Sequence, residues 1–288
     1  MERKGRAYAA IVAGAALWGL IGLWNRRLMA GGISPTDIVA VRNIGGMALL
    51  GLYALLRRRE VFTAGKRYWK CFFGTGVISV VLFTACYFSC QQLCSLAVAS
   101  VLLYTAPVFV MLLSALVWRE AVTPRKLLAL VLTLAGCACV CGLFAGALTV
   151  TPAGLALGLG AGFFYALYSI FGRTALSGGC DALTVTVWTF LFAGPASAVL
   201  VRPGELAAAL SAPGMWACAA ALVVLSTALP YLLYTWGLAR VEAGKASILA
   251  CVEPVVAALA GVLAFGEPMS VLTAAGIALV LAGVYILR

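Results

Sequence analysis

The chain has 288 residues, of which 64% are hydrophobic and 10% charged, and its net charge is +11 at pH 7. A water-soluble domain carries about 25% charged residues, so this composition excludes a soluble globule, and the absence of histidine excludes histidine catalysis and histidine–metal sites. The basic residues cluster at the ends of apolar segments, which favours a role in membrane orientation over nucleic-acid binding.

The apolar segments follow one another at the spacing of membrane spans. A helix needs about 20 apolar residues to cross a bilayer core, and the chain divides into about ten segments of that size. We expect spans at about residues 8–29, 36–56, 69–93, 97–118, 126–145, 153–173, 182–201, 214–238, 245–265 and 269–287. The first follows MERKGR, and because no small-x-small cleavage site follows it, we interpret it as an uncleaved span rather than a signal peptide.

The distribution of Lys and Arg predicts the orientation. If the N-terminus is cytoplasmic, most basic residues fall in cytoplasmic segments, and only Arg26, Arg27 and Arg202 fall in outside segments. This is the bias of the positive-inside rule. We therefore expect a multi-pass protein of the cytoplasmic membrane with both termini in the cytoplasm.

Two stretches of the chain repeat each other. Residues 105–120 read TAPVFVMLLSALVWRE and residues 252–267 read VEPVVAALAGVLAFGE, so that Pro107 and Glu120 lie 147 residues before Pro254 and Glu267. Trp69 and Cys71 match Trp and Cys at the same offset, which low-complexity apolar sequence does not readily produce. The repeated proline predicts an interrupted helix in each copy.

This offset predicts two repeats, at residues 1–146 and 147–288. Each repeat holds about five spans, and an odd number of spans inverts the second copy in the membrane. The predicted fold is an all-α integral membrane protein with ten transmembrane helices in two inverted-topology five-helix repeats. Inverted repeats around a midplane site are typical of transporters that work by alternating access.

Several motifs resemble the EamA family of the drug/metabolite transporter superfamily. They are ALWG, DIVAVRN, AVASVLLYTAPVFVMLLSALVWREAVT, YLLYTWGLARVEAGKASILACVEPV and AFGEPMS, and the likeness covers nearly the whole chain. The resemblance implies ten helices, inverted repeats, and a central cavity lined mainly by helices 1, 3, 4, 6, 8 and 9. It also implies export or exchange of amino acids or other small metabolites.

Glu253 is the main candidate for chemistry inside the membrane. It precedes Pro254 near the middle of the ninth expected span. A carboxylate there costs about 2.5–3.5 kcal/mol on insertion scales, so it should face water or the bundle interior. We expect it to bind substrate or exchange a proton. The alternative is a structural ion pair, for which Arg42 and Lys245 are the candidate partners.

Aromatic side chains recur on matching faces of the two copies, and Asn25 and Gln91 add neutral hydrogen-bonding groups beside them. Trp18 is the repeat equivalent of Tyr165, and Tyr87 of Tyr234. Such rings can stack on a substrate or hold an organic cation, and the alternative is packing or interface anchoring. The expected substrate-binding set is Trp18, Asn25, Tyr87, Gln91, Tyr104, Tyr165, Tyr168, Tyr234 and Glu253.

Other patterns carry no cofactor chemistry. Cys137, Cys139 and Cys141 alternate along a helix, which points them apart, so we expect packing residues and no metal site. Gly158 and Gly162 lie on one face of a helix and predict close packing. No phosphate-binding loop occurs, and we expect no cofactor and no use of ATP.

These patterns together predict a secondary active exporter or exchanger of small metabolites. Amino acids, amines and aromatic compounds are the candidate substrates, and a proton is the candidate coupling ion. The expected partners are the substrate and the lipid bilayer, without nucleic acid, and one chain holds a complete pathway. The alternatives are a non-transporting membrane protein or an intramembrane enzyme, which lacks an obvious set of catalytic residues here.

Overall fold

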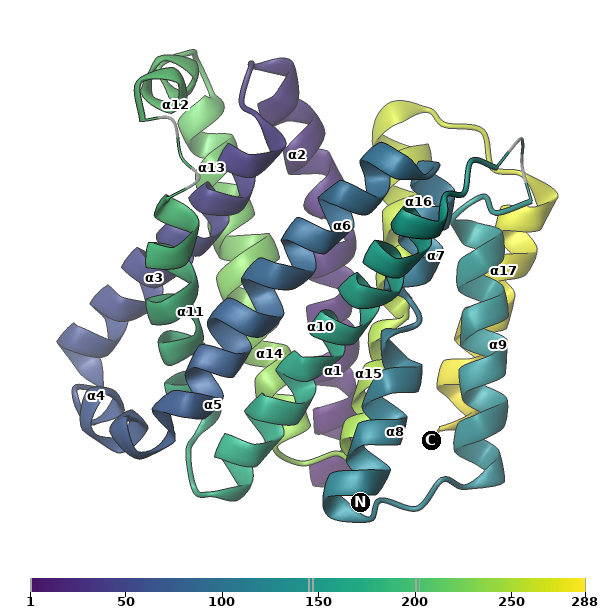
Figure 1. Ribbon diagram of the computed structural model, residues 1–288, viewed down its shortest axis with the longest axis horizontal. Coiled ribbons are helices and arrows are strands. Elements are labelled where there is room, and N and C mark those ends of the chain that lie inside the picture. Colours follow the sequence, from purple (N-terminus) through teal and green to yellow (C-terminus); the bar gives the residue numbers. More distant parts are fainter. Residues whose placement is uncertain (1, 145, 147, 200, 202, 288) are drawn as a thin grey trace.

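The computed structural model describes residues 2–144, 146, 148–199, 201 and 203–287, and within them the chain is helical, without β-strands. Arg202, which the sequence places in an outside segment, lies outside the described residues. The helices run side by side as one bundle, and both chain ends lie at the same end of it, the lower end in Figure 1. We call this the terminal end.

The helices of the first half are α1 (Glu2–Gly19), α2 (Ile21–Ala30), α3 (Pro35–Arg57), α4 (Glu60–Ala64), η1 (Gly65–Tyr68), α5 (Trp69–Phe73), the π-helical η2 (Gly74–Val81), α6 (Leu82–Leu93), α7 (Leu96–Leu103), α8 (Ala106–Trp118) and α9 (Pro124–Val140). Those of the second half are α10 (Pro152–Ser177), α11 (Ala182–Ala198), α12 (Pro203–Leu210), α13 (Met215–Val223), the π-helical η3 (Val224–Ala228), α14 (Leu229–Leu238), α15 (Ala243–Ala250), α16 (Val252–Phe265) and α17 (Val271–Ile286).

Many of these helices have the length and composition of membrane spans. In the described part of the chain, seven helical stretches qualify: Lys4–Ala30, Pro35–Arg57, Glu60–Leu93, Leu96–Trp118, Pro152–Ser177, Met215–Leu238 and Ala243–Phe265. Ala182–Ala198 and Val271–Ile286 are shorter apolar helices. α9 has 17 residues and packs along α17. The expected segments therefore fall on helices, while the count of ten spans stays a prediction.

Helix starts recur 147 residues apart. The side chain of Ser34 caps α3, and that of Asp181 caps α11. Thr123 caps α9, and Ser270 caps α17. In each case a side-chain oxygen accepts a hydrogen bond from the backbone N–H three residues on, which satisfies a free donor of the first helical turn. The same capping chemistry therefore begins equivalent helices in the two halves.

The predicted helix interruptions are confirmed. α7 ends at Leu103 and α8 begins at Ala106, while α15 ends at Ala250 and α16 begins at Val252. In both places proline occupies the first turn of the new helix, where its missing N–H costs no hydrogen bond. The interruption at Tyr104 lies 147 residues before the one at Cys251.

The glycine face of α10 packs closely against α7 and the start of α8, as its spacing predicts. A Cβ atom on Gly158 would lie 2.4 Å from a side-chain carbon of Leu102, and one on Gly162 would lie 2.7 Å from the Thr105 hydroxyl. Only glycine permits this approach, which brings α10 beside the interrupted helix of the first half.

Candidate functional site

A cavity of about 510 Å³ lies between α1, α2, α3, α6, α7, α10, α14 and α16. Its lining brings together most of the residues that the sequence singles out: Trp18, Asn25, Arg42, Tyr87, Gln91, Tyr104, Tyr165 and Glu253. Tyr168 and Tyr234 do not line this cavity and lie beneath it, around a void of about 10 Å³. Lys245 lies elsewhere, at the terminal end.

Glu253 is held at the start of α16, directly after the interruption at Cys251. α1 passes close to this point, since a Cβ atom on Gly19 would lie 2.6 Å from the carbonyl oxygen of Glu253. The N-terminal end of a helix carries partial positive charge and favours a carboxylate in its first turn. Tyr104 lies within interaction range of this carboxylate. The helix break thus presents one acidic group to the cavity.

Arg42 faces the same cavity from α3. Its Nε donates a hydrogen bond of 3.2 Å to the Thr227 hydroxyl on η3. Among the described residues, no direct ion pair joins Arg42 to Glu253, although each lies within range of the other's charge. The terminal nitrogens of Arg42 have no hydrogen-bond acceptor in the described part of the protein. The cavity therefore holds a cation and an anion that are not paired with each other.

Neutral polar groups extend this pattern. The side-chain oxygen Oδ1 of Asn25 is buried and has no hydrogen-bond partner among the described residues. Tyr87 exchanges a hydrogen bond of 3.1 Å with Ser100, and Gln91 lines the cavity one helical turn further on. A buried acceptor without a partner is costly, so the Asn25 oxygen is available to a ligand donor.

Four packed rings, those of Trp18, Tyr168, Tyr231 and Tyr234, form the floor of the cavity, and Tyr231 lies edge to face with both Trp18 and Tyr168. The ring centroids of Tyr231 and Trp18 are 5.1 Å apart, as are those of Tyr231 and Tyr168. Tyr168 shares a hydrogen bond of 2.6 Å with Thr235, and Tyr234 one of 2.8 Å with Ser169. These contacts close the cavity toward the terminal end.

The cavity opens at the other end of the bundle. Met29, Pro35 and Leu96 are part of its lining, and they lie at helix ends, next to the turns that join α2 to α3 and α6 to α7. These turns lie at the upper end of the bundle in Figure 1. We call this opening the mouth. Among the described residues, the lining of the cavity thus extends toward the end of the bundle opposite the terminal end.

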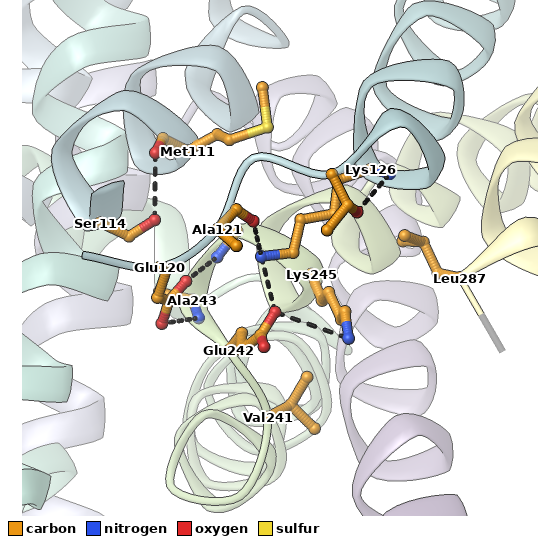
Figure 2. A network of polar contacts seen from close by, with 12 residues as sticks. Met111, Ser114, Glu120, Ala121, Lys126, Val241, Glu242, Ala243, Lys245 and Leu287 are labelled. Atoms are coloured by element: carbon orange, nitrogen blue, oxygen red, sulfur yellow. Dashed lines mark hydrogen bonds and ion pairs between the residues drawn. The ribbon is translucent and has the colours of Figure 1, made fainter. Parts of the chain in front are cut away.

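Polar side chains seal the terminal end. The Glu120 carboxylate accepts hydrogen bonds from the backbone N–H groups of Ala243 and Gly244, at 3.2 and 3.4 Å, and so holds the start of α15 (Figure 2). Nearby, Arg173 on α10 donates hydrogen bonds to the carbonyl oxygens of Leu238, at 2.7 Å, and Val241. Both side chains bind the ends of neighbouring helices.

Tyr231 and Phe83 are cavity residues that the sequence interpretation missed. Tyr231 lies 147 residues after Thr84, which also lines the cavity. Neither residue has an aromatic equivalent in the other half, since Phe83 matches Pro230 at this offset, so the repeat does not mark them.

The cavity shows no metal-binding group. Within the described residues, no three His, Cys, Asp or Glu side chains are close enough together to hold a metal ion. The chemistry that the site offers is one guanidinium, one carboxylate, uncharged hydrogen-bonding groups and aromatic surface.

Known proteins with similar sequences are named as transporters. An uncharacterised transporter of Archaeoglobus fulgidus is 33% identical over 268 residues, which cover 87% of this chain and 90% of that protein. A second uncharacterised transporter of the same organism is 27% identical and covers 88% of each chain. A solved structure, described only as the crystal structure of a protein, superposes with a TM-score of 0.83 over 98% of this chain. The superposition covers 96% of the solved chain, and the two sequences are 20% identical, so the likeness shows a shared fold alone.

The EamA-like transporter family matches the chain at residues 5–142 and again at residues 152–288. Together the two matches cover nearly the whole sequence. They fit the apolar helices of a multi-pass membrane protein, and they point to a transporter rather than an enzyme. This chain belongs to the EamA-like transporter family, which is part of the drug/metabolite transporter superfamily.

Proposed function

We propose that this protein is a secondary transporter of small zwitterionic metabolites of the amino-acid class, and that it works by alternating access. The observation that carries the proposal is the presence of Arg42 and Glu253 in one cavity, unpaired with each other and surrounded by aromatic rings. A zwitterion supplies the opposite charge to each group, and the cavity of about 510 Å³ has room for a molecule of this size.

Each part of an amino acid has a complementary group in the cavity. The carboxylate fits the terminal nitrogens of Arg42, whose planar fork suits bidentate binding. The ammonium fits Glu253 and the partnerless oxygen of Asn25. The side chain then contacts Tyr165 and Phe83, whose ring centroids lie 5.4 Å apart. Since apolar and aromatic rings dominate this wall, apolar and aromatic side chains are the preferred substrates.

Alternation follows from the repeat. If the second half is an inverted copy of the first, the contacts now at the terminal end can form at the mouth between equivalent residues, while those at the terminal end break. The recurrence of helix caps and interruptions at an offset of 147 supports this inverted arrangement. Glu253 is also the candidate group for proton exchange during the cycle.

The charge pairing can be tested with three probes: phenylalanine, its amide, which lacks the carboxylate, and 3-phenylpropionate, which lacks the ammonium. We expect phenylalanine to bind the parent protein about tenfold or more tightly than either analogue, the range of hydrogen bonds to charged groups. Arg42→Gln should remove the preference for phenylalanine over its amide. Glu253→Gln should remove the preference for phenylalanine over 3-phenylpropionate. Arg27→Gln is the matched control, since Arg27 is exposed and does not line the cavity.

Flux in proteoliposomes completes the test. Glu253→Gln should fold, because no direct ion pair depends on it among the described residues, yet it should lose coupled transport, because an amide cannot ionise. If Glu253 were instead a structural partner of Arg42, the variant should lose stability and Arg42→Gln should partly restore it. A stable Glu253→Gln protein with parental flux and unchanged pH dependence would reject the assigned role of this residue.

A further inference from the structure

A second cavity, of about 910 Å³, opens at the terminal end between α1, α9, α15 and α17. It is separate from the substrate cavity, with which it shares no lining residue. Four basic residues from three helices line it, Lys4 on α1, Arg125 and Lys126 on α9, and Lys245 on α15. The proposed transport cycle uses none of them.

The basic residues outnumber the acidic ones around this cavity. Lys126, whose side chain is 3% exposed, lies 2.6 Å from the Glu242 carboxylate, and Lys245 lies 3.5 Å from the same oxygen (Figure 2). Burial opposes the ionisation of Glu242, but the hydrogen bond and charge of Lys126 and the charge of Lys245 outweigh it and lower the pKa of this carboxyl group. One carboxylate thus balances two ammonium groups, and Lys4 and Arg125 have no carboxylate partner among the described residues.

Below its basic rim the cavity continues as an apolar trough. One wall is a face of α1 that carries a row of small residues, Gly5, Ala9, Ala13 and Ala16, flanked by Tyr8 and Val12. The opposite wall includes Leu249 and Val284. From residue 5 to residue 16 a helix rises by about 16 Å. Small residues at this spacing usually let another helix approach, yet Ala9 and Ala13 remain exposed.

We propose that this cavity binds a phospholipid with an anionic headgroup. The phosphate lies between Lys4, Arg125 and Lys245, and one acyl chain fills the trough along α1. A soluble anion would satisfy the rim but leave the trough empty, whereas a void beside the lipid-facing surface of a membrane protein is filled by lipid. Basic pockets between transmembrane helices are a known mode of anionic lipid recognition.

The cavity lies beside the start of α15, so a lipid bound there can stabilise the closed arrangement of the terminal end. Lys245 follows Gly244 directly, and the N–H of Gly244 is one of the two that Glu120 holds. A headgroup on Lys245 therefore adds a contact to the start of α15 in the present arrangement. An anionic lipid should favour the state that is closed at the terminal end.

Native mass spectrometry of the detergent-solubilised chain tests the proposal directly, with phosphatidylglycerol and phosphatidylcholine of identical acyl chains as probes. Each basic residue near a membrane surface contributes about a fivefold gain in affinity for an anionic lipid. We expect phosphatidylglycerol to bind the parent at least tenfold more tightly. Lys4→Gln combined with Arg125→Gln should remove most of that preference.

Two further variants separate charge from shape. Ala13→Trp fills the trough without changing charge and should weaken the binding of both lipids. Arg240→Gln is the matched control, since Arg240 is exposed at the terminal end, lies 3.9 Å over the ring of Trp236 and does not line this cavity. It should leave the lipid preference unchanged.

Glycerol 3-phosphate is the probe for a soluble anion. If it competes with phosphatidylglycerol at similar concentration, the cavity is a phosphate site and the lipid proposal is wrong. Equal affinity of the parent for the two phospholipids would also overturn it, as would an unchanged preference in the variant that lacks Lys4 and Arg125.

Discussion

Glu120 and Glu267 stand 147 residues apart and follow the ends of equivalent helices, α8 and α16, but they make different contacts. At the terminal end, Glu120 accepts hydrogen bonds from Ala243 and Gly244 at the start of α15. At the mouth, the equivalent helix start is Leu96 and Ala97 on α7, and Glu267 instead lies 2.6 Å from Arg26. The helices before the two glutamates both end on a left-handed residue, with φ of 56° and 67°. The local backbone is therefore alike, and the partner differs.

The arginines repeat the same contrast. Arg173 binds the carbonyl oxygens of Leu238 and Val241, where α14 ends. Its equivalent Arg26 would bind Gln91 and Cys94, where α6 ends, but it pairs with Glu267 and lies 4.4 Å over the ring of Phe265. At one end the arginine and the glutamate each hold a neighbouring helix. At the other end they hold each other.

On the proposed cycle, this difference is how two copies of one sequence pattern hold opposite ends of the bundle in opposite states. α8 packs firmly against α15, while the equivalent pair, α16 and α7, makes little contact. In one state the arginine and the glutamate of an end bind each other, and in the other state each binds the end of a neighbouring helix. The number of polar contacts changes little between the two states, so they can be close in energy. On the proposed cycle, closing the mouth moves Arg26 and Glu267 onto α6 and α7, and opening the terminal end lets Arg173 and Glu120 pair.

Cross-linking the terminal end should have the largest effect. Glu120→Cys combined with Gly244→Cys places two thiols where the side chain and backbone now meet, and a short bis-maleimide reagent should join them. Because the terminal end could then no longer open, we expect transport in proteoliposomes to fall to background while phenylalanine still binds from the mouth. The two single variants, treated with the same reagent, control for modification of the native cysteines.

The equivalent pair at the mouth is Glu267→Cys with Ala97→Cys. It should cross-link only when the mouth closes, and the joined protein should lose binding from the mouth side. Parental transport in either fully cross-linked protein would contradict alternation between the two ends.

Removing the charge of one glutamate at a time should give a smaller effect with opposite signs. Glu120→Gln weakens charge-assisted hydrogen bonds that exist only in the present state, so this state should become less populated. Glu267→Gln weakens bonds of the alternative state and, in the present one, only an exposed ion pair of low value. The lost hydrogen bonds stabilise the present state by about 1 kcal/mol. The affinity for phenylalanine added from the mouth should therefore fall about fivefold in Glu120→Gln. It should stay constant or rise in Glu267→Gln, and a fall in both would remove the contrast between the ends.

Much of this arrangement could be predicted from the sequence, because it depends on backbone chemistry that local residues specify. Proline after an apolar helix start marks the interruptions, and Ser, Thr and Asp mark the helix starts. Glu253 is conspicuous because a carboxylate is rare within an apolar span. These signals do not depend on which helices are neighbours.

The partners of charged residues could not be predicted, because they depend on how the helices are packed. The sequence offers Lys245 and Arg42 equally as partners of Glu253, but Lys245 lies beside Glu242 and Arg42 binds Thr227. In the same way, nothing in the sequence distinguishes the cavity wall from its floor: Tyr165 lines the cavity while Tyr168, one turn away, is hydrogen-bonded to Thr235 beneath it. The state of each end is likewise a property of packing.

A pair of equivalent tyrosines should sharpen the comparison with a further, smaller effect. Tyr234 is buried in the floor and bonded to Ser169, whereas Tyr87 lies on the cavity wall and is bonded to Ser100. Tyr234→Phe leaves a buried Ser169 without its partner and should cost about 1 kcal/mol of stability. Tyr87→Phe should cost less, because water in the cavity can replace the lost bond. Melting temperatures in detergent measure both, and an equal loss would mean that the floor is no more closed than the wall.

The smallest expected effect concerns the ion pairs of Glu242 at the start of α15. The equivalent helix start at the mouth, that of α7, has no such ion pair among the described residues. Glu242 directly precedes α15 and lies beside Lys126 and Lys245, while its equivalent before α7 is Ser95, whose hydroxyl is buried without a hydrogen-bond partner among the described residues. The pKa of Glu242 is lowered in the folded protein, so its ionised form is stabilising above the usual glutamate range and this contribution is lost as the pH falls through the folded-state pKa. Because Glu242 is partly exposed, the gain should be at most about 1 kcal/mol. In zwitterionic detergent, Glu242→Gln should melt slightly below the parent between pH 6 and 8, and the difference should shrink below a pH of about 4, where a free glutamate is itself protonated. A gap that persists at low pH would mean that the variant acts through packing rather than charge.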